Sequence, residues 1–134
     1  MRHKQGFTLI EIMLVVIILG VLAAMVVPKL TGRSDEARRS VAKTDIDSNI
    51  ALAIDLYDVD VGSYPESLED LLRAPGEVTN WKGPYLKKQP LDPWGRAYVY
   101  HYPGDHNEDG YDLLSTGKDG TEGSADDIVN WEEE

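Results

Sequence analysis

The sequence has 134 residues and no cysteine. A small domain of this composition has no disulfides to stabilise it, so its fold must rest on a hydrophobic core, a metal or neighbouring subunits. Basic residues are scarce, with 13 Lys and Arg against 24 Asp and Glu and a net charge of −11. This balance argues against nucleic-acid binding, because phosphate groups require a basic surface.

The negative charge is concentrated towards the C-terminus. From His101 onward there are eleven carboxylates and one cation, Lys118, so this stretch carries −10 of the net −11. Such a concentration indicates either a solvated acidic tail, which is the commoner case, or a cation site.

The N-terminal end has the opposite character. Residues 1–6 are short and basic, and residues 7–27 are almost wholly apolar. As a helix, these 21 residues would span about 31 Å, the thickness of the hydrocarbon core of a bilayer. Arg2 and Lys4 place the N-terminus in the cytoplasm by the positive-inside rule, so residues 28–134 are predicted to be exported.

Three explanations compete for this apolar segment. A cleaved secretory signal peptide usually has a shorter apolar run and a cleavage site of small residues, which Val26–Lys29 does not provide. A plain signal anchor remains open. Glu11 argues against it, because a carboxylate costs about 2.5 kcal/mol or more at the bilayer centre and somewhat less towards the interface. Glu11 therefore indicates a partner that it meets after insertion.

Residues 6–11, G-F-T-L-I-E, resemble the processing site of type IV pilins and pseudopilins. The resemblance implies that a dedicated membrane peptidase removes the leader, residues 1–6, by cleavage between Gly6 and Phe7. It further implies that the new amine of Phe7 is methylated and that Glu11 acts in assembly. Pro28 falls where these proteins often carry a helix-bending proline.

The second half of the chain resembles the major pseudopilins of type II secretion systems. G-S-Y-P, G-P-Y-L, L-D-P-W-G and S-T-G-K-D-G follow in the family's order, and D-D-I-V-N-W looks like its C-terminal signature; they occupy residues 62–65, 83–86, 91–95, 115–120 and 126–131. Most adhesive type IV pilins, by contrast, close a C-terminal loop with a cysteine pair.

This resemblance implies a type IV pilin-like α+β fold, in which a long N-terminal helix packs on a small antiparallel sheet with long loops. It implies a structural subunit of the periplasmic pseudopilus that drives protein export, anchored by one span in the inner membrane with its C-terminal domain in the periplasm. The implied partners are further copies of the chain, minor pseudopilins, the prepilin peptidase, the inner-membrane secretion platform and, before assembly, membrane lipid.

Two alternative functions stay open at this stage. One is a subunit of an adhesive or DNA-uptake fibre, and the other is a signal-anchored periplasmic enzyme or calcium-binding sensor that would retain residues 1–6. No catalytic constellation supports an enzyme. His101 and His106 have no Cys nucleophile to activate, and Ser115 lies in no nucleophile elbow.

Hydrophobic periodicity predicts an amphipathic helix over residues 34–61, which Ser34 or Asp35 would cap and Gly62 would end. Its apolar stripe should pack on the chain's own domain and consists of Ile46, Ile50, Ala53, Ile54, Tyr57 and Val61.

The remaining residues, 62–134, are predicted to form loops and a small sheet. We expect a short helix over 67–72 and strands over 96–100 and 111–115, joined by a turn at 104–110. The pairs Tyr64-Pro65, Pro84-Tyr85 and Pro93-Trp94 are interpreted as fixed loops with their rings on the core, and not as a ligand platform.

Asp119, Asp126 and Asp127 lie within nine residues and alternate with glycines that permit tight turns. Hard oxygen donors without a soft ligand suit Ca²⁺, and a merely solvated loop is the alternative. The major pseudopilins bind calcium in this loop. The resemblance therefore implies these three side chains as ligands, with backbone carbonyls of Thr116, Thr121 and Ser124 as weaker candidates.

Residues 105–110 match the first half of an EF-hand loop, D-x-N-x-D-G. The twelfth position, which needs a bidentate Glu, is Thr116. We interpret this segment as a hairpin turn in which Asn107 and Gly110 accept positive φ, with a second ion at Asp105 and Asp109 as the alternative.

Overall fold

The computed structural model describes Met1 and residues 6–132, except for the side chains of residues 27–31. The chain forms two compact units, residues 1–36 and 37–134. Pro28 lies among the residues whose side chains are not described.

The first unit is dominated by an exposed apolar helix. Helix α1 spans Leu9–Thr44 and thus continues into the second unit. Its stretch Leu9–Val26 has a mean hydropathy of 3.0 and is long and apolar enough to cross a membrane. Ser34 and Asp35 lie inside α1, so the predicted cap at these residues is wrong: the apolar and amphipathic segments belong to one helix.

The amphipathic part of the helix is interrupted by one turn of different geometry. A π-helical turn, η1, covers Asp45–Ile50 and is followed directly by helix α2, Ala51–Val61. Gly62 ends α2 with a φ of 89°, and its N–H donates to the carbonyl of Asp58 at 2.7 Å. The predicted stop at Gly62 is confirmed, since glycine adopts this left-handed conformation without steric cost.

The predicted apolar stripe forms the core of the second unit. Most of its members are buried, Val61 is partly buried, and Ala42 extends the stripe by one turn towards the N-terminus. The stripe packs against four buried side chains from the rest of the unit, namely Leu71, Tyr98, Leu113 and Ile128. The expectation that this face packs on the chain's own domain is confirmed.

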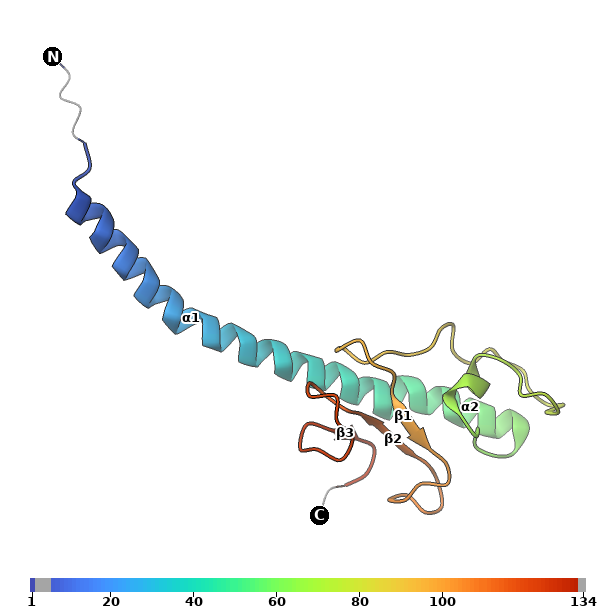
Figure 1. Cartoon of the computed structure of the whole chain (residues 1–134). Coiled ribbons are helices and arrows are strands. Elements are labelled where there is room, and N and C mark those ends of the chain that lie inside the picture. The colour runs from blue at the N-terminus through green and yellow to red at the C-terminus, as the bar shows by residue number, and fades with distance from the viewer. Residues whose placement is uncertain (2–5, 133–134) are drawn as a thin grey trace. The chain divides into compact units, whose positions relative to one another are not determined.

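The sheet is smaller than the loops around it. Strands β1 (Val99–His101), β2 (Asp112–Ser115) and β3 (Ile128–Val129) lie side by side and antiparallel, with β2 in the middle (Figure 1). β1 begins three residues later than predicted, since Ala97 instead forms an isolated bridge with Leu91. β3 was not predicted.

The loop residues 62–98 contain one short helix, the 3₁₀ turn η2, at Leu68–Leu71. Its start is capped by Asp70, whose carboxylate accepts hydrogen bonds from the N–H groups of Glu66 and Ser67. This turn confirms the position of the predicted short helix. The tight 3₁₀ geometry suits a single turn.

The aromatic rings of this loop rest on the core, as predicted. Partly buried residues that pack against it include Tyr64, Trp81, Tyr85 and Trp94. Tyr85 Oη donates to Asp60 at 2.8 Å, and Trp81 Nε1 donates to the carbonyl of Asp70 at 2.8 Å. The buried Nε1 of Trp94 has no hydrogen-bond partner among the described residues.

Candidate functional site

The start of α1 contains the predicted processing and assembly residues. Gly6 and Phe7 precede the helix in an exposed, non-helical segment, and Phe7 is 80% exposed. A peptidase can therefore reach the bond between them without unwinding the helix.

Glu11 caps its own helix. The backbone N–H of Thr8 donates to Glu11 Oε2 at 3.4 Å, and the N–H of Glu11 donates to Thr8 Oγ1 at 3.3 Å. This reciprocal pair is a capping box, and it gives the N–H of Thr8 an acceptor at the start of an apolar helix. Our sequence reasoning missed this role, although T-x-x-E before an apolar run is its ordinary signature.

The acidic loop, residues 116–127, is folded by its own carboxylates. Asp119 Oδ1 accepts a hydrogen bond from the N–H of Thr121 at 2.9 Å, and Asp126 Oδ2 accepts one from the N–H of Asp119 at 3.2 Å. Asp127 Oδ2 accepts one from the N–H of Gly123 at 2.7 Å. Each predicted ligand thus already orders a turn of the loop.

Glycines allow these turns. Gly117, Gly120 and Gly123 have φ values of 64°, 70° and 85°, a region that favours glycine. The prediction that these glycines permit tight turning is confirmed.

Cationic side chains hold the loop from outside. Arg96 Nη1 donates to the carbonyl of Gly117 at 2.8 Å, and Arg39 Nη1 donates to the carbonyl of Asp126 at 2.9 Å. Lys43 Nζ donates to the carbonyl of Val129 at 2.8 Å, just beyond the loop. The backbone of the acidic segment is therefore fixed at both ends by positive charge.

Asp119 stays ionised in this setting. The hydrogen bond from the backbone N–H of Thr121, with the Ser124 hydroxyl and the charge of Arg96, lowers the pKa of Asp119 below its ordinary value. A carboxylate that remains charged is the form that a cation requires.

The donor chemistry of the acidic loop fits calcium, since carboxylate and carbonyl oxygens are its preferred ligands. The three side chains are not gathered as closely as a metal centre requires: in the described part of the chain, no three His, Cys, Asp or Glu side chains form a group that could hold an ion. Of the candidate carbonyls, that of Ser124 already accepts a hydrogen bond from the N–H of Asp127 at 3.2 Å.

The segment with the half EF-hand pattern is a turn, as predicted, and it is organised by Asp112. The N–H groups of Asp105 and His106 donate to Asp112 Oδ2, both at 2.9 Å, and that of Asn107 donates to Oδ1 at 3.0 Å. Gly104 leaves room for this carboxylate, because a Cβ there would lie 2.6 Å from Asp112 Oδ1. Our sequence reasoning missed Asp112.

One detail of that prediction is wrong. No non-glycine residue in the described ranges has positive φ, and Gly110 is not among the glycines that do. The turn needs no left-handed residue, because the Asp112 carboxylate bridges its N–H groups. Asn107 Nδ2 instead donates to the carbonyl of Tyr111 at 3.0 Å.

The electrostatics of Asp112 follow from these contacts. Burial alone would raise the pKa of Asp112, but the hydrogen bonds from His106, Asn107 and Asp105 outweigh it and lower the pKa below its ordinary value. The side chain is 2% exposed, so its charge is stabilised almost wholly by protein groups.

His106 links this turn to the C-terminal segment. Its Nδ1 lies 2.9 Å from Asp112 Oδ2, and its ring stacks on that of Trp131 with centroids 3.9 Å apart and planes 4° from parallel. Because 25 positions separate the two residues in the sequence, no local sequence pattern predicts their contact.

Known protein families and relatives match this chain. The family model "Type II secretion system (T2SS), protein G" matches residues 29–131, and the model "Prokaryotic N-terminal methylation motif" matches residues 1–27. The chain is 49% identical to type II secretion system core protein G of Pseudomonas aeruginosa, over 98% of this chain and 97% of that protein. It is 46% identical to the core protein G of Escherichia coli K12, over 96% and 91%.

A solved structure agrees. The major pseudopilin from the type 2 secretion system of enterohaemorrhagic Escherichia coli superimposes with a TM-score of 0.66 at 31% identity, covering 76% of this chain and 89% of that one. The fold is thus the type IV pilin-like α+β fold of fibre subunits. The chain belongs to the type II secretion system protein G family, the major pseudopilins. This is a family of structural subunits and not of enzymes, and the predicted resemblance is confirmed.

Proposed function

We propose that this chain is the major structural subunit of a periplasmic pseudopilus that drives protein export through a type II secretion system. The observation that carries the proposal is the continuity of the two matches, residues 1–27 and 29–131, in one chain. A subunit that begins as a membrane protein and ends as part of a fibre needs both parts.

Before assembly, the apolar stretch of α1 would hold the chain in the inner membrane, with its acidic domain in the periplasm. Assembly would bring together copies of the chain, minor pseudopilins and the inner-membrane secretion platform. Head-to-tail contacts between copies that do not close into a ring generate an open helical fibre, so one subunit type suffices to extend it.

Processing is the first test. Cleavage between Gly6 and Phe7 with one methyl group on the Phe7 amine is expected, because both residues lie exposed before the helix. Intact-mass measurement of membrane-extracted protein, from a host that carries a prepilin peptidase, reads out both events. An N-terminus at Met1 or beyond Val27 would contradict the proposal.

Glu11 is proposed to exchange partners during assembly. In the single chain its carboxylate accepts a hydrogen bond from the Thr8 N–H at 3.4 Å, a long contact that a full positive charge can replace. Cleavage creates such a charge at the Phe7 amine, which a neighbouring copy can bring to Glu11. A buried carboxylate in hydrocarbon requires a counter-charge of this kind.

Glu11→Ala should therefore insert and be cleaved normally, yet assemble poorly and fail to support secretion. Glu36→Ala, which removes an exposed carboxylate from the same helix, is the matched control. Fibre yield and secreted protein are measured in cells that lack the wild-type subunit. Wild-type fibres and secretion with Glu11→Ala would refute the exchange.

Calcium is proposed to complete the acidic loop. The side chains of Asp119, Asp126 and Asp127 would hold the ion, with carbonyls of Thr116, Thr121 and Ser124 as further donors. Its chemical contribution would be to neutralise repulsion between carboxylates in a loop that Arg96 and Arg39 already fix. Titration calorimetry with calcium tests binding directly, and no heat at millimolar calcium would exclude the site.

A further inference from the structure

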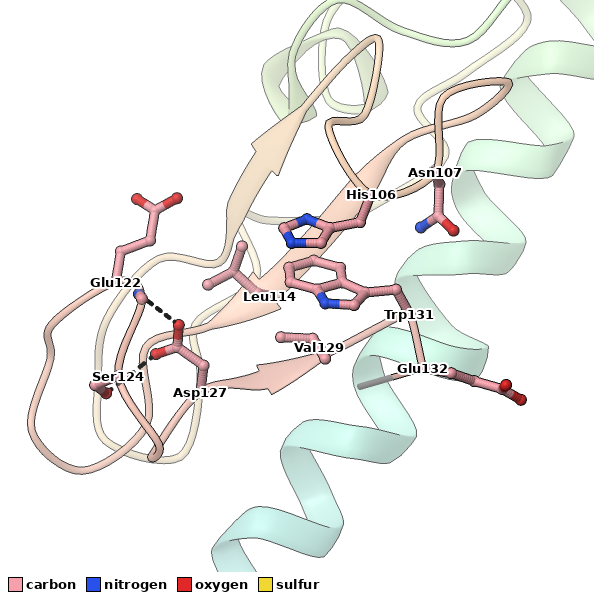
Figure 2. A pocket seen from close by; sticks show the side chains of 10 residues that line it. His106, Asn107, Leu114, Glu122, Ser124, Asp127, Val129, Trp131 and Glu132 are labelled. Carbon is pink, nitrogen blue, oxygen red and sulfur yellow. Dashed lines mark hydrogen bonds between the residues drawn. The ribbon is translucent and has the colours of Figure 1, made fainter. Parts of the chain in front are cut away.

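A cavity of about 840 Å³ opens beside the C-terminal segment. Leu114 and Val129 form its floor (Figure 2). The stacked rings of His106 and Trp131 stand on one side, and the acidic loop at residues 122–127 stands on the other. The cavity thus combines an apolar floor, a flat aromatic wall and a polar wall.

Both walls are held in place by the chain itself. His106 is fixed by its contact with Asp112 at 2.9 Å, and Asp127 is fixed by the Gly123 N–H at 2.7 Å. Glu122 lies 2.9 Å from the Nε2 of His101, which restrains its carboxylate at the rim. A cavity with restrained walls loses little conformational entropy when it is filled.

The lining selects a cationic, amphipathic occupant. Glu122 and Glu132 bring carboxylates to the rim, and among the described lining residues His106 is the side chain that can carry positive charge. A long basic side chain lays its methylene stem on apolar surface and its charge near carboxylates or an indole face. An arginine side chain provides both the apolar stem and the charge, and its planar guanidinium also stacks on aromatic rings.

The chain itself supplies such a group on another surface. Arg39 and Lys43 already donate to the C-terminal segment of their own chain. Arg38 is exposed and has no hydrogen bond or ion pair among the described residues. Val41 lies one turn further on the same helix and is 54% exposed. Arg38 and Val41 together present one charge and one apolar side chain, matching the cavity's rim and floor.

We propose that the cavity receives the Arg38–Val41 face of α1 from a second copy of the chain. The inference rests on the proposed assembly into a fibre. The cavity and the Arg38 face are different surfaces, so one copy can offer its cavity to the next copy and its Arg38 face to the previous one. Repeated without closing into a ring, this head-to-tail contact extends a fibre. Opposite charges on the two surfaces also favour this pairing over contacts between other surfaces.

The absence of native cysteine makes the contact measurable by cross-linking. Single-cysteine chains Glu122→Cys and Arg38→Cys are produced together in cells that assemble fibres. A short bis-maleimide is then added, because an Arg–Glu pair separates its Cβ atoms more than a disulfide permits. A cross-linked dimer is expected. Glu108→Cys with Arg38→Cys is the control, since Glu108 is also an exposed carboxylate but does not line the cavity.

Two outcomes would overturn the inference. One is fibres that assemble with no 122–38 product, and the other is an equal yield of product with the Glu108 control. Arg38→Glu should lower fibre yield roughly tenfold by placing like charges together, and adding Glu122→Arg should restore it. No restoration would also count against the contact. Failure of the wild-type chain to form fibres would instead refute the proposed function.

Discussion

The turn at residues 104–112 and the acidic loop at 116–127 are both rich in carboxylates that accept backbone N–H groups, yet they differ in how these carboxylates are placed. In the turn, one buried carboxylate, Asp112, gathers three backbone N–H groups. In the loop, the carboxylates lie nearer to solvent, and Arg96 and Arg39 fix the backbone from outside. The density of acidic residues therefore does not predict how a segment is held, whereas the hydrogen-bond partners of each oxygen describe it.

Removal of Asp112 should have the largest effect on stability. Asp112→Ala leaves three N–H groups without their acceptor, and each unsatisfied buried donor costs about 1–3 kcal/mol. We expect a loss of roughly 3 kcal/mol or more in the free energy of unfolding of a soluble fragment that begins after Pro28. Asp109→Ala, an exposed carboxylate of the same turn, should change it by less than about 0.5 kcal/mol. Urea denaturation measures the free energy of unfolding of both variants. Equal losses would show that Asp112 does not organise the turn.

Calcium should stabilise the loop and leave the turn unaffected. Binding to the folded state alone adds about 2.7 kcal/mol when free calcium is a hundredfold above Kd. EDTA should lower the melting temperature of the fragment by several degrees, calcium should restore it, and magnesium should restore it poorly because it demands smaller octahedral coordination.

Asp119→Ala should abolish this calcium response, and Glu108→Ala in the turn should preserve it. By loosening the loop against neighbouring copies, Asp119→Ala should also reduce fibre assembly. Identical melting curves in EDTA and in calcium would show that the loop is only a solvated acidic segment.

Loss of the Arg96 side chain, which holds the loop from outside, should lower the stability of the loop by a smaller amount. Arg96→Ala removes a charged hydrogen bond to the carbonyl of Gly117, which is worth about 1.5 kcal/mol. Arg73→Ala is a suitable control, since its ion pair with Glu69 is largely exposed and contributes little. Thermal denaturation in EDTA compares the two. A larger loss for Arg73→Ala would contradict the anchoring role of Arg96.

The smallest expected effect is a dependence on pH that belongs to the turn. Because the folded-state pKa of Asp112 lies below its unfolded value, its contribution is present above the unfolded pKa of about 3.9 and is lost as pH falls through the folded pKa. Between about pH 6 and pH 3, the wild-type fragment should therefore lose more stability than Asp112→Asn, which has no proton to take up. Parallel losses would indicate that other carboxylates account for the acid sensitivity.

Much of the fold could be predicted because its signals are local. The stripe from Ile46 to Val61 has helical spacing, and Gly62 ends the helix because it alone tolerates the left-handed conformation there. β3 could not be predicted, since two residues carry no periodicity and Ile128 and Val129 are ordered by pairing with β2.

The candidate sites were predicted unevenly for the same reason. Gly6, Phe7 and Glu11 lie in one short motif that the sequence shows directly, but the helix begins at Leu9 and not at Phe7 as predicted, because the Thr8 and Glu11 cap fixes its start. Asp112 lies beyond the turn that it organises. Its role depends on three N–H groups that converge only once the chain has turned back.

The π-helical turn at Asp45–Ile50 corrects the direction in which the buried residues of the helix face. The buried residues Ala42, Ile46, Ile50 and Ile54 advance in steps of four, and in an α-helix each such step drifts about 40° around the axis. One wider turn rotates the stripe back, so Ala42 before it and Ile54 after it face the same core. The π-helical turn therefore holds one residue more than an α-helical turn would. Deletion of a single residue within Asp45–Ile50 would convert this turn into an ordinary α-helical one, whereas the same deletion within α2 would swing the following core residues by about 100°.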